Sequence, residues 1–283
     1  MKNKQTIIVL GGVLLFAALF FFGKTVNPAK ENKQVEQHHA GDGHDHGIDF
    51  SDLLLKAKSS LLAEKLQQVE TIEKQLQNSS TEEKIHIYHR LASFWKDSVG
   101  VFEPYAYYTA EAAKLDNSEK SLTFAAQLFI DNLFDEAEPS KQNWLATNGK
   151  VLLEKALEIN PNNDSSKIGI GACYLFGNIS ENPMEGILQV KAIVDKNPDN
   201  LYAQWVLALG SKKSGQYDKA IDRLLIIVEK QPTNLSAILH LAECYELNNN
   251  NTEAIKWYKV IKNVIPNPEA KKELQQRIEQ LQH

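Results

Sequence analysis

Four of the chain's eight histidines lie within nine residues, in the stretch HHAGDGHDHG. Imidazoles together with carboxylates suit zinc, copper or nickel. A resident metal site also needs fixed ligands and supporting hydrogen bonds, which a run punctuated by glycine does not supply. We therefore interpret the cluster as part of a tether that binds metal weakly and adventitiously, and keep metal handling as an alternative function. The candidate ligands are His38, His39, His44 and His46.

Other reactive side chains form no recognisable catalytic pattern. His86 and His89 lie three residues apart, a spacing that fits a surface or partner-contact role better than metal ligation on its own. The chain contains no P-loop, no G-x-S-x-G and no H-E-x-x-H sequence. The sequence therefore predicts a protein that is not an enzyme and needs no cofactor.

An apolar segment precedes the histidine cluster. Residues 7–22, IIVLGGVLLFAALFFF, carry no charge. At about 1.5 Å per residue such a helix just crosses a bilayer core. A cleaved signal peptide is the alternative, but no convincing small-residue cleavage site follows. Lys2 and Lys4 favour an N-terminus that stays inside. We expect residues 1–23 to be an uncleaved, single-pass anchor in a bacterial inner membrane, with the remaining chain in the periplasm.

Residues 24–47 are predicted to be a flexible, histidine-rich linker. They are polar and contain several glycines, and they offer almost nothing to bury. The body that follows, residues 48–283, has 26 basic and 32 acidic residues. Such a body repels phosphate backbones, so nucleic acid is a poor candidate partner.

Residues 48–79 predict one amphipathic helix, because apolar residues recur every seven positions after a serine suited to N-capping. The helix either packs on the following domain or dimerises as a coiled coil. Ser59 and Glu73 interrupt the second apolar column, which favours packing. The heptad residues are Leu55, Leu62, Val69 and Leu76.

The C-terminal half repeats itself. Prolines 161, 198, 232 and 266 follow apolar helical runs at intervals of 37, 34 and 34 residues. Residues 201–234 superpose on 235–268 without a gap, so that Leu207-Ala208 matches Leu241-Ala242 and Gly215 matches Asn249. Such a fixed period indicates stacked helix-turn-helix units that share one core.

These residues resemble the tetratricopeptide repeat (TPR) family, which has small residues late in the first helix, an alanine opening the second and a closing proline. The resemblance implies an all-α, right-handed α-solenoid of about five helix-turn-helix repeats with a C-terminal capping helix. In the third unit Gly186 replaces the alanine. The solenoid covers 82–283, with units at about 82–117, 118–163, 164–200, 201–234 and 235–268 and a cap at 269–282.

The same resemblance implies a concave groove, lined by first helices, that holds a peptide or helix of a partner. Tyr202 and Trp205 would supply an aromatic anchor, unless Trp205 packs between repeats. Lys212 and Lys213 would meet an acidic group on the ligand. The implied lining is Ser165, Ile168, Ala172, Leu175, Phe176, Tyr202, Trp205, Leu209, Lys212, Lys213, Ser236, Leu239, Glu243, Glu246 and Leu247.

Cys173 and Cys244 fall in first helices two repeats apart, too far for a disulfide, so both are expected to be buried free thiols.

Taken together, the apolar segment, the linker and the repeats favour a membrane-tethered scaffold that binds peptide or helical segments of other proteins in its groove. An assembly factor for a redox or envelope complex, as in cytochrome maturation, is the second hypothesis, and metal handling through the linker is the third.

Overall fold

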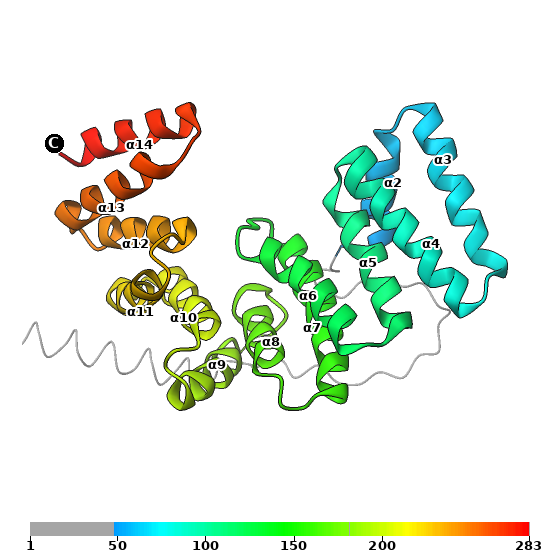
Figure 1. Cartoon of the computed structure of the whole chain (residues 1–283), viewed down its shortest axis with the longest axis horizontal. Coiled ribbons are helices and arrows are strands. Elements are labelled where there is room, and N and C mark those ends of the chain that lie inside the picture. The colour runs from blue at the N-terminus through cyan, green and yellow to red at the C-terminus, as the bar shows by residue number, and fades with distance from the viewer. Residues whose placement is uncertain (1–47, 181, 283) are drawn as a thin grey trace, which may run out of the picture. The chain divides into compact units, whose positions relative to one another are not determined.

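The computed structural model describes residues 48–180 and 182–282, which belong to one compact unit (Figure 1). None of the helices in these ranges is long and apolar enough to cross a membrane. The predicted anchor (residues 1–23) and the predicted linker (residues 24–47), including the four clustered histidines, lie outside the described residues.

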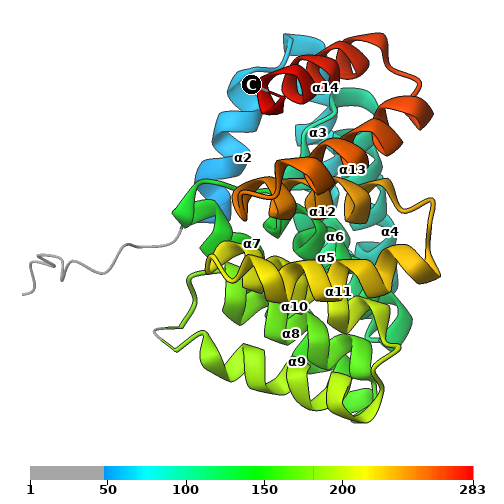
Figure 2. The ribbon, with the colours of Figure 1, turned by 90° about the vertical axis from the view of Figure 1, so that its left-hand side faces the viewer.

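The described chain is built from helices, with no strand in either range. Five pairs of consecutive helices pack side by side, and each pair packs on the next (Figure 2). The predicted all-α solenoid of about five repeats with a capping helix is confirmed. The pairs are α4 (Thr81–Ser93) with α5 (Phe102–Asp116), α6 (Glu119–Leu133) with α7 (Pro139–Ile159), α8 (Asp164–Phe176) with α9 (Met184–Lys196), α10 (Leu201–Lys213) with α11 (Tyr217–Lys230), and α12 (Leu235–Leu247) with α13 (Asn251–Val264). The helix α14 (Pro268–Leu281) packs on α13 as the cap.

Helix starts and turns follow from local side chains. Asn163, Asn200 and Asn234 cap α8, α10 and α12, each accepting a hydrogen bond from the backbone N–H three residues on. The turns inside the last two pairs contain Gly215 and Asn249, both left-handed, with φ of 73° and 59°. The superposed repeats match these two positions to each other, and both residue types tolerate the left-handed conformation.

Small residues let the helices approach. Ala208, Ala220, Ala242 and Ala254 have no exposed surface. Large aliphatic side chains fill the spaces between them, as close packing requires. Both cysteines are buried and unpaired, as predicted. Burial raises the pKa of Cys173 to about 12 and that of Cys244 to about 11, so both thiols are inert apolar groups.

The predicted single helix over residues 48–79 is wrong. The structure has two helices, α2 (Phe50–Ser59) and α3 (Ala63–Lys74), followed by a short 3₁₀ turn (Gln75–Asn78). The Ser59 and Ser60 hydroxyls each donate 2.8 Å hydrogen bonds to carbonyls in the last turn of α2, which competes with continuation of the helix. The seven-residue column is consequently split: Leu62 is 77% exposed, whereas Val69 is fully buried.

The helix pair α2–α3 packs on the first repeat, α2 against α5 and α3 against α4. Glu73 on α3 links this helix to α2 and α5. It forms an ion pair with Lys58 at 2.5 Å and accepts a 2.8 Å hydrogen bond from the Tyr108 hydroxyl. This arrangement agrees with the packing alternative for the segment. Helix α4 itself continues into a π-helical turn (Phe94–Val99) that ends at the left-handed Gly100.

Candidate protein-binding groove

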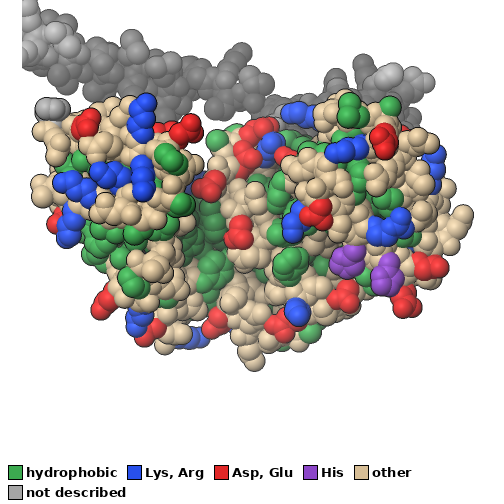
Figure 3. All heavy atoms as spheres, turned by 45° about the horizontal axis from the view of Figure 1, so that its top comes forward, with side chains coloured by type: hydrophobic (Ala, Val, Ile, Leu, Met, Phe, Trp, Pro, Cys, Tyr) green, Lys and Arg blue, Asp and Glu red, His purple; other side chains and the backbone are tan. Residues whose placement is uncertain are grey.

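Helices α6, α10, α11 and α12 enclose a cavity of about 450 Å³, which we name the α6–α12 groove. The face drawn in Figure 3 is hollowed, with hydrophobic side chains in the hollow and acidic side chains beside it. The volume accommodates a few side chains of a bound segment rather than a whole domain. The groove is lined by Gln127, Asp131, Phe134, Asp135, Leu201, Tyr202, Trp205, Ile227, Gln231, Asn234, Ser236 and His240.

The aromatic wall comes from α10 and α12. Trp205 is half-buried: it packs against the hydrophobic clusters on either side of it and also lines the groove. Its ring lies 5.2 Å from the ring of His240, centroid to centroid. Trp205 therefore packs between repeats and also lines the groove, while its role as an anchor for a ligand stays a prediction. Tyr202 lines the groove too, but its hydroxyl is buried without a hydrogen-bond partner among the described residues, and burial raises its pKa.

The side of the groove formed by α6 and the turn after it is acidic. Asp131, in the last turn of α6, and Asp135, in the following turn, are both exposed. The Gln127 amide donates a 2.6 Å hydrogen bond to Asp131. A second cavity, of about 260 Å³, shares both aspartates and adds Glu103, Glu136 and Lys141.

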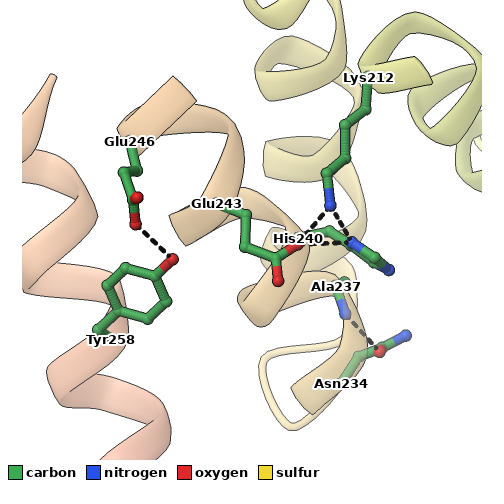
Figure 4. Close-up of polar contacts among 7 residues, drawn as sticks. All are labelled: Lys212, Asn234, Ala237, His240, Glu243, Glu246 and Tyr258. Atoms are coloured by element: carbon green, nitrogen blue, oxygen red, sulfur yellow. Dashed lines mark hydrogen bonds and ion pairs between the residues drawn. The ribbon is translucent and has the colours of Figure 1, made fainter. Parts of the chain in front are cut away.

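Lys212 does not offer a free charge. Its Nζ lies 2.9 Å from His240 Nδ1 and forms an ion pair with Glu243 (Figure 4). Burial alone would raise the pKa of Glu243, but hydrogen bonds from His240 and Lys212 outweigh it and lower the pKa to about 2. The expectation that Lys212 meets an acidic ligand is therefore corrected, because Glu243 already neutralises it.

Four further residues of the predicted lining are buried in the core. Ile168 and Ala172 have no exposed surface, and Phe176 and Leu209 are 6% and 8% exposed. They pack in the cluster that joins the middle repeats. We correct their assignment: they belong to the core and do not line the groove, because neighbouring helices cover the side of α8 and α10 from which they project.

The other predicted residues lie at the margins. Leu175, Leu239 and Glu246 are half-buried, while Ser165 and Leu247 are exposed, and none of them lines the groove. Lys213 is exposed, with its Nζ 5.4 Å from the centroid of the Phe176 ring, and desolvation lowers its pKa. Of the predicted set, the structure brings Tyr202, Trp205 and Ser236 together in the groove.

The α6 side of the groove was not predicted. Gln127 and Asp131 lie four residues apart on one face of α6, and Asp135 follows in the turn after the helix. The groove pattern of the later units, extended back into the second unit, would have pointed to Gln127 and Asp131.

The described residues contain no group of three or more His, Cys, Asp or Glu side chains placed to hold a metal ion. His86 and His89 are both exposed on α4. Both line a shallow hollow that also contains Arg90, whose positive charge would repel a bound metal ion.

Comparison with known families agrees with the repeat pattern. Residues 211–278 match the tetratricopeptide repeat model. This range covers the end of α10 and the helices α11 to α13, with most of the cap. It overlaps the two repeat units that superpose without a gap in the sequence. No curated protein sequence matches the chain.

Several solved structures are similar to the chain. MamA, residues 41 to the end, from Desulfovibrio magneticus RS-1 is 18% identical, with a TM-score of 0.43, and the match covers 66% of this chain and all of that one. YrrB, described as a TPR protein with an unusual peptide-binding site, is 15% identical with a TM-score of 0.41, over 74% of this chain and 99% of that one. A TPR protein from Parabacteroides merdae is 13% identical with a TM-score of 0.40, over 80% of this chain and 87% of that one.

Proposed function

We propose that this protein is an interaction scaffold that holds a segment of a partner polypeptide in the α6–α12 groove. The observation that carries the proposal is the cavity itself, in which side chains from α6, α10 and α12 converge although these helices lie far apart in the sequence. A concave site with aromatic anchors and a few polar groups is the usual form of a binding site.

The groove composition favours a polypeptide over a small metabolite. Leu201, Phe134 and Trp205 offer apolar surface. The Asn234 amide caps α12 and donates to the Gln231 oxygen, which leaves the Gln231 NH₂ group as a donor beside that surface. A main-chain carbonyl of a bound segment would accept from this group, and one or two of its side chains would fill the apolar part.

Trp205→Ala tests the proposal. Truncating a central tryptophan typically costs about 2 kcal/mol or more of binding free energy, so we expect partner capture to fall by at least about tenfold. The assay is chemical cross-linking of the tagged full-length chain in native membranes, followed by affinity purification and quantitative mass spectrometry.

Trp257→Ala is the matched control, since Trp257 is also half-buried but lies on α13, outside the groove. The control should retain its partners. Equal capture by wild type and Trp205→Ala would contradict the proposed function, provided that both proteins keep the same helical circular dichroism.

Tethering to a membrane is the second part of the proposal. The uncharged residues 7–22 support an anchor, and Lys2 and Lys4 support export of the body to the periplasm. Removing residues 1–47 should release a folded chain into the soluble fraction. Protease added to spheroplasts should digest the full-length body. A truncated chain that stays with the membrane would contradict tethering through residues 1–47. A body protected from protease would contradict its location in the periplasm.

A further inference from the structure

The two walls of the α6–α12 groove differ in charge. Among the described residues that line the groove none is Lys or Arg, whereas Asp131 and Asp135 are included, and both are exposed. The adjoining cavity shares this aspartate pair and adds Glu103 and Glu136. The groove therefore presents two carboxylates at the C-terminal end of α6 and aromatic surface along α10.

Two cations beside the groove, Lys141 and Lys212, are already paired within the chain. Lys141, in the adjoining cavity, lies 3.2 Å from Glu103, and its hydrogen bond to that carboxylate raises the pKa of Lys141. Lys212 pairs with Glu243 beside His240. Among the described residues, Asp131 and Asp135 make no ion pair. An incoming cation would thus meet them without displacing an internal partner.

We propose that the groove selects polypeptide segments that place a lysine or arginine side chain beside an aromatic or branched apolar one. This inference rests on the proposed function and adds the chemistry of the partner. The cation would lie near Asp131, in the last turn of α6, and Asp135, in the turn that follows this helix; both carboxylates line the groove. The apolar side chain would pack against Trp205 and Phe134.

Charge complementarity distinguishes this partner from an acidic one. A segment rich in Asp or Glu would place its charge against two unpaired carboxylates, and like charges at close range are unfavourable. A segment with arginine should bind more tightly than one with lysine, because the planar guanidinium forms two hydrogen bonds with a carboxylate and stacks on aromatic rings.

The test is selection from a random dodecapeptide library displayed on phage, with the purified full-length chain in detergent as bait. The first variant carries Asp131→Asn with Asp135→Asn. The matched control carries Glu269→Gln with Glu273→Gln, which removes the same charge from two exposed positions one turn apart on α14. Trp205→Ala serves as the test of the groove.

We expect wild type and the α14 control to select peptides enriched in Lys or Arg next to Trp, Tyr, Phe or Leu. The Asp131/Asp135 variant should still select apolar peptides but lose the basic enrichment. For one synthetic selected peptide, the same variant should bind about tenfold more weakly by calorimetry at low salt. That difference should shrink at high salt, because the two aspartates are exposed.

Two failures would be told apart. If wild type selects nothing above an empty support, or if Trp205→Ala selects the same peptides, the groove does not bind polypeptide and the proposed function fails. If selection depends on Trp205 but the peptides lack basic residues, or keep them with the Asp131/Asp135 variant, the charge inference is overturned while the groove stands.

Discussion

Gly186→Ala is the most discriminating test of the packing. TPR units have alanine at this place, and alanine is the better helix former by up to about 1 kcal/mol, so a consensus argument predicts stabilisation. The structure predicts the reverse. A Cβ atom built at Gly186 would lie 2.5 Å from the carbonyl oxygen of Gly171 on α8, and 2.9 Å from Cβ of Tyr174.

The magnitude follows from what must move. The carbonyl oxygen belongs to the backbone of α8, so no side-chain rotation relieves the overlap, and α8 and α9 would have to separate by roughly half an ångström or more. Overpacking of this kind typically costs about 1–3 kcal/mol. Set against a gain of about 1 kcal/mol in helix propensity, the middle of that range leaves a net loss of about 1 kcal/mol, which lowers Tm by about 2–4 °C for a chain of this size.

The assay is thermal unfolding of the purified full-length chain, followed by far-ultraviolet circular dichroism. Gly210→Ala is the control, because a Cβ there would meet only the Leu175 methyl groups, at the ordinary contact distance of 3.6 Å. The control should be neutral or slightly stabilised. A Gly186→Ala variant as stable as wild type, or more stable, would refute the close approach of α8 and α9.

Three further predictions concern polar groups. The pKa of Glu243 is depressed in the folded state, so its carboxylate contributes stability that is present above about pH 4.5 and lost as pH falls toward about 2. The stability gap between wild type and Glu243→Gln, measured by urea unfolding, should close over that range, and a gap that persists at the acid end would contradict this. Cys173 and Cys244 should not react with a thiol reagent in the native protein and should both react in denaturant, because both are buried with raised pKa values; rapid native labelling would show otherwise. Tyr108→Phe should cost about 1 kcal/mol, since it removes the hydrogen bond to Glu73 that ties α5 to α3, and hydrogen exchange should rise in α2 and α3 first; unchanged exchange there would argue against this tie.

Local and periodic features of the fold were predictable from sequence. The interval between closing prolines and the match of Gly215 with Asn249 both arise because the same helix pair is repeated along the chain. They can therefore be recognised from the sequence without knowledge of tertiary contacts. The helix break at Ser60 was not predictable from the heptad pattern. The spacing of apolar residues does not reveal that the Ser60 hydroxyl donates a hydrogen bond to a carbonyl in the last turn of α2.

The groove was harder to predict than the helices. Equivalent positions in the aligned repeats show which face of its helix a residue occupies. They do not show how much of that residue the next helix covers. Ile168 and Trp205 hold equivalent places in successive units, yet the first is fully buried and the second lines the groove. Asp131 and Asp135 reach the same cavity from a distant unit, and that placement depends on how successive pairs stack.

The most direct test of the scaffold proposal is site-specific photo-cross-linking in living cells. Benzoylphenylalanine would replace Ser236, which is exposed and lines the groove, or Gln276, which is exposed on α14 outside it. We predict that the probe at position 236 yields a polypeptide adduct that Trp205→Ala abolishes, while the probe at position 276 yields none. Adducts of equal amount at both positions, or an adduct at position 236 that survives Trp205→Ala, would contradict binding in the α6–α12 groove.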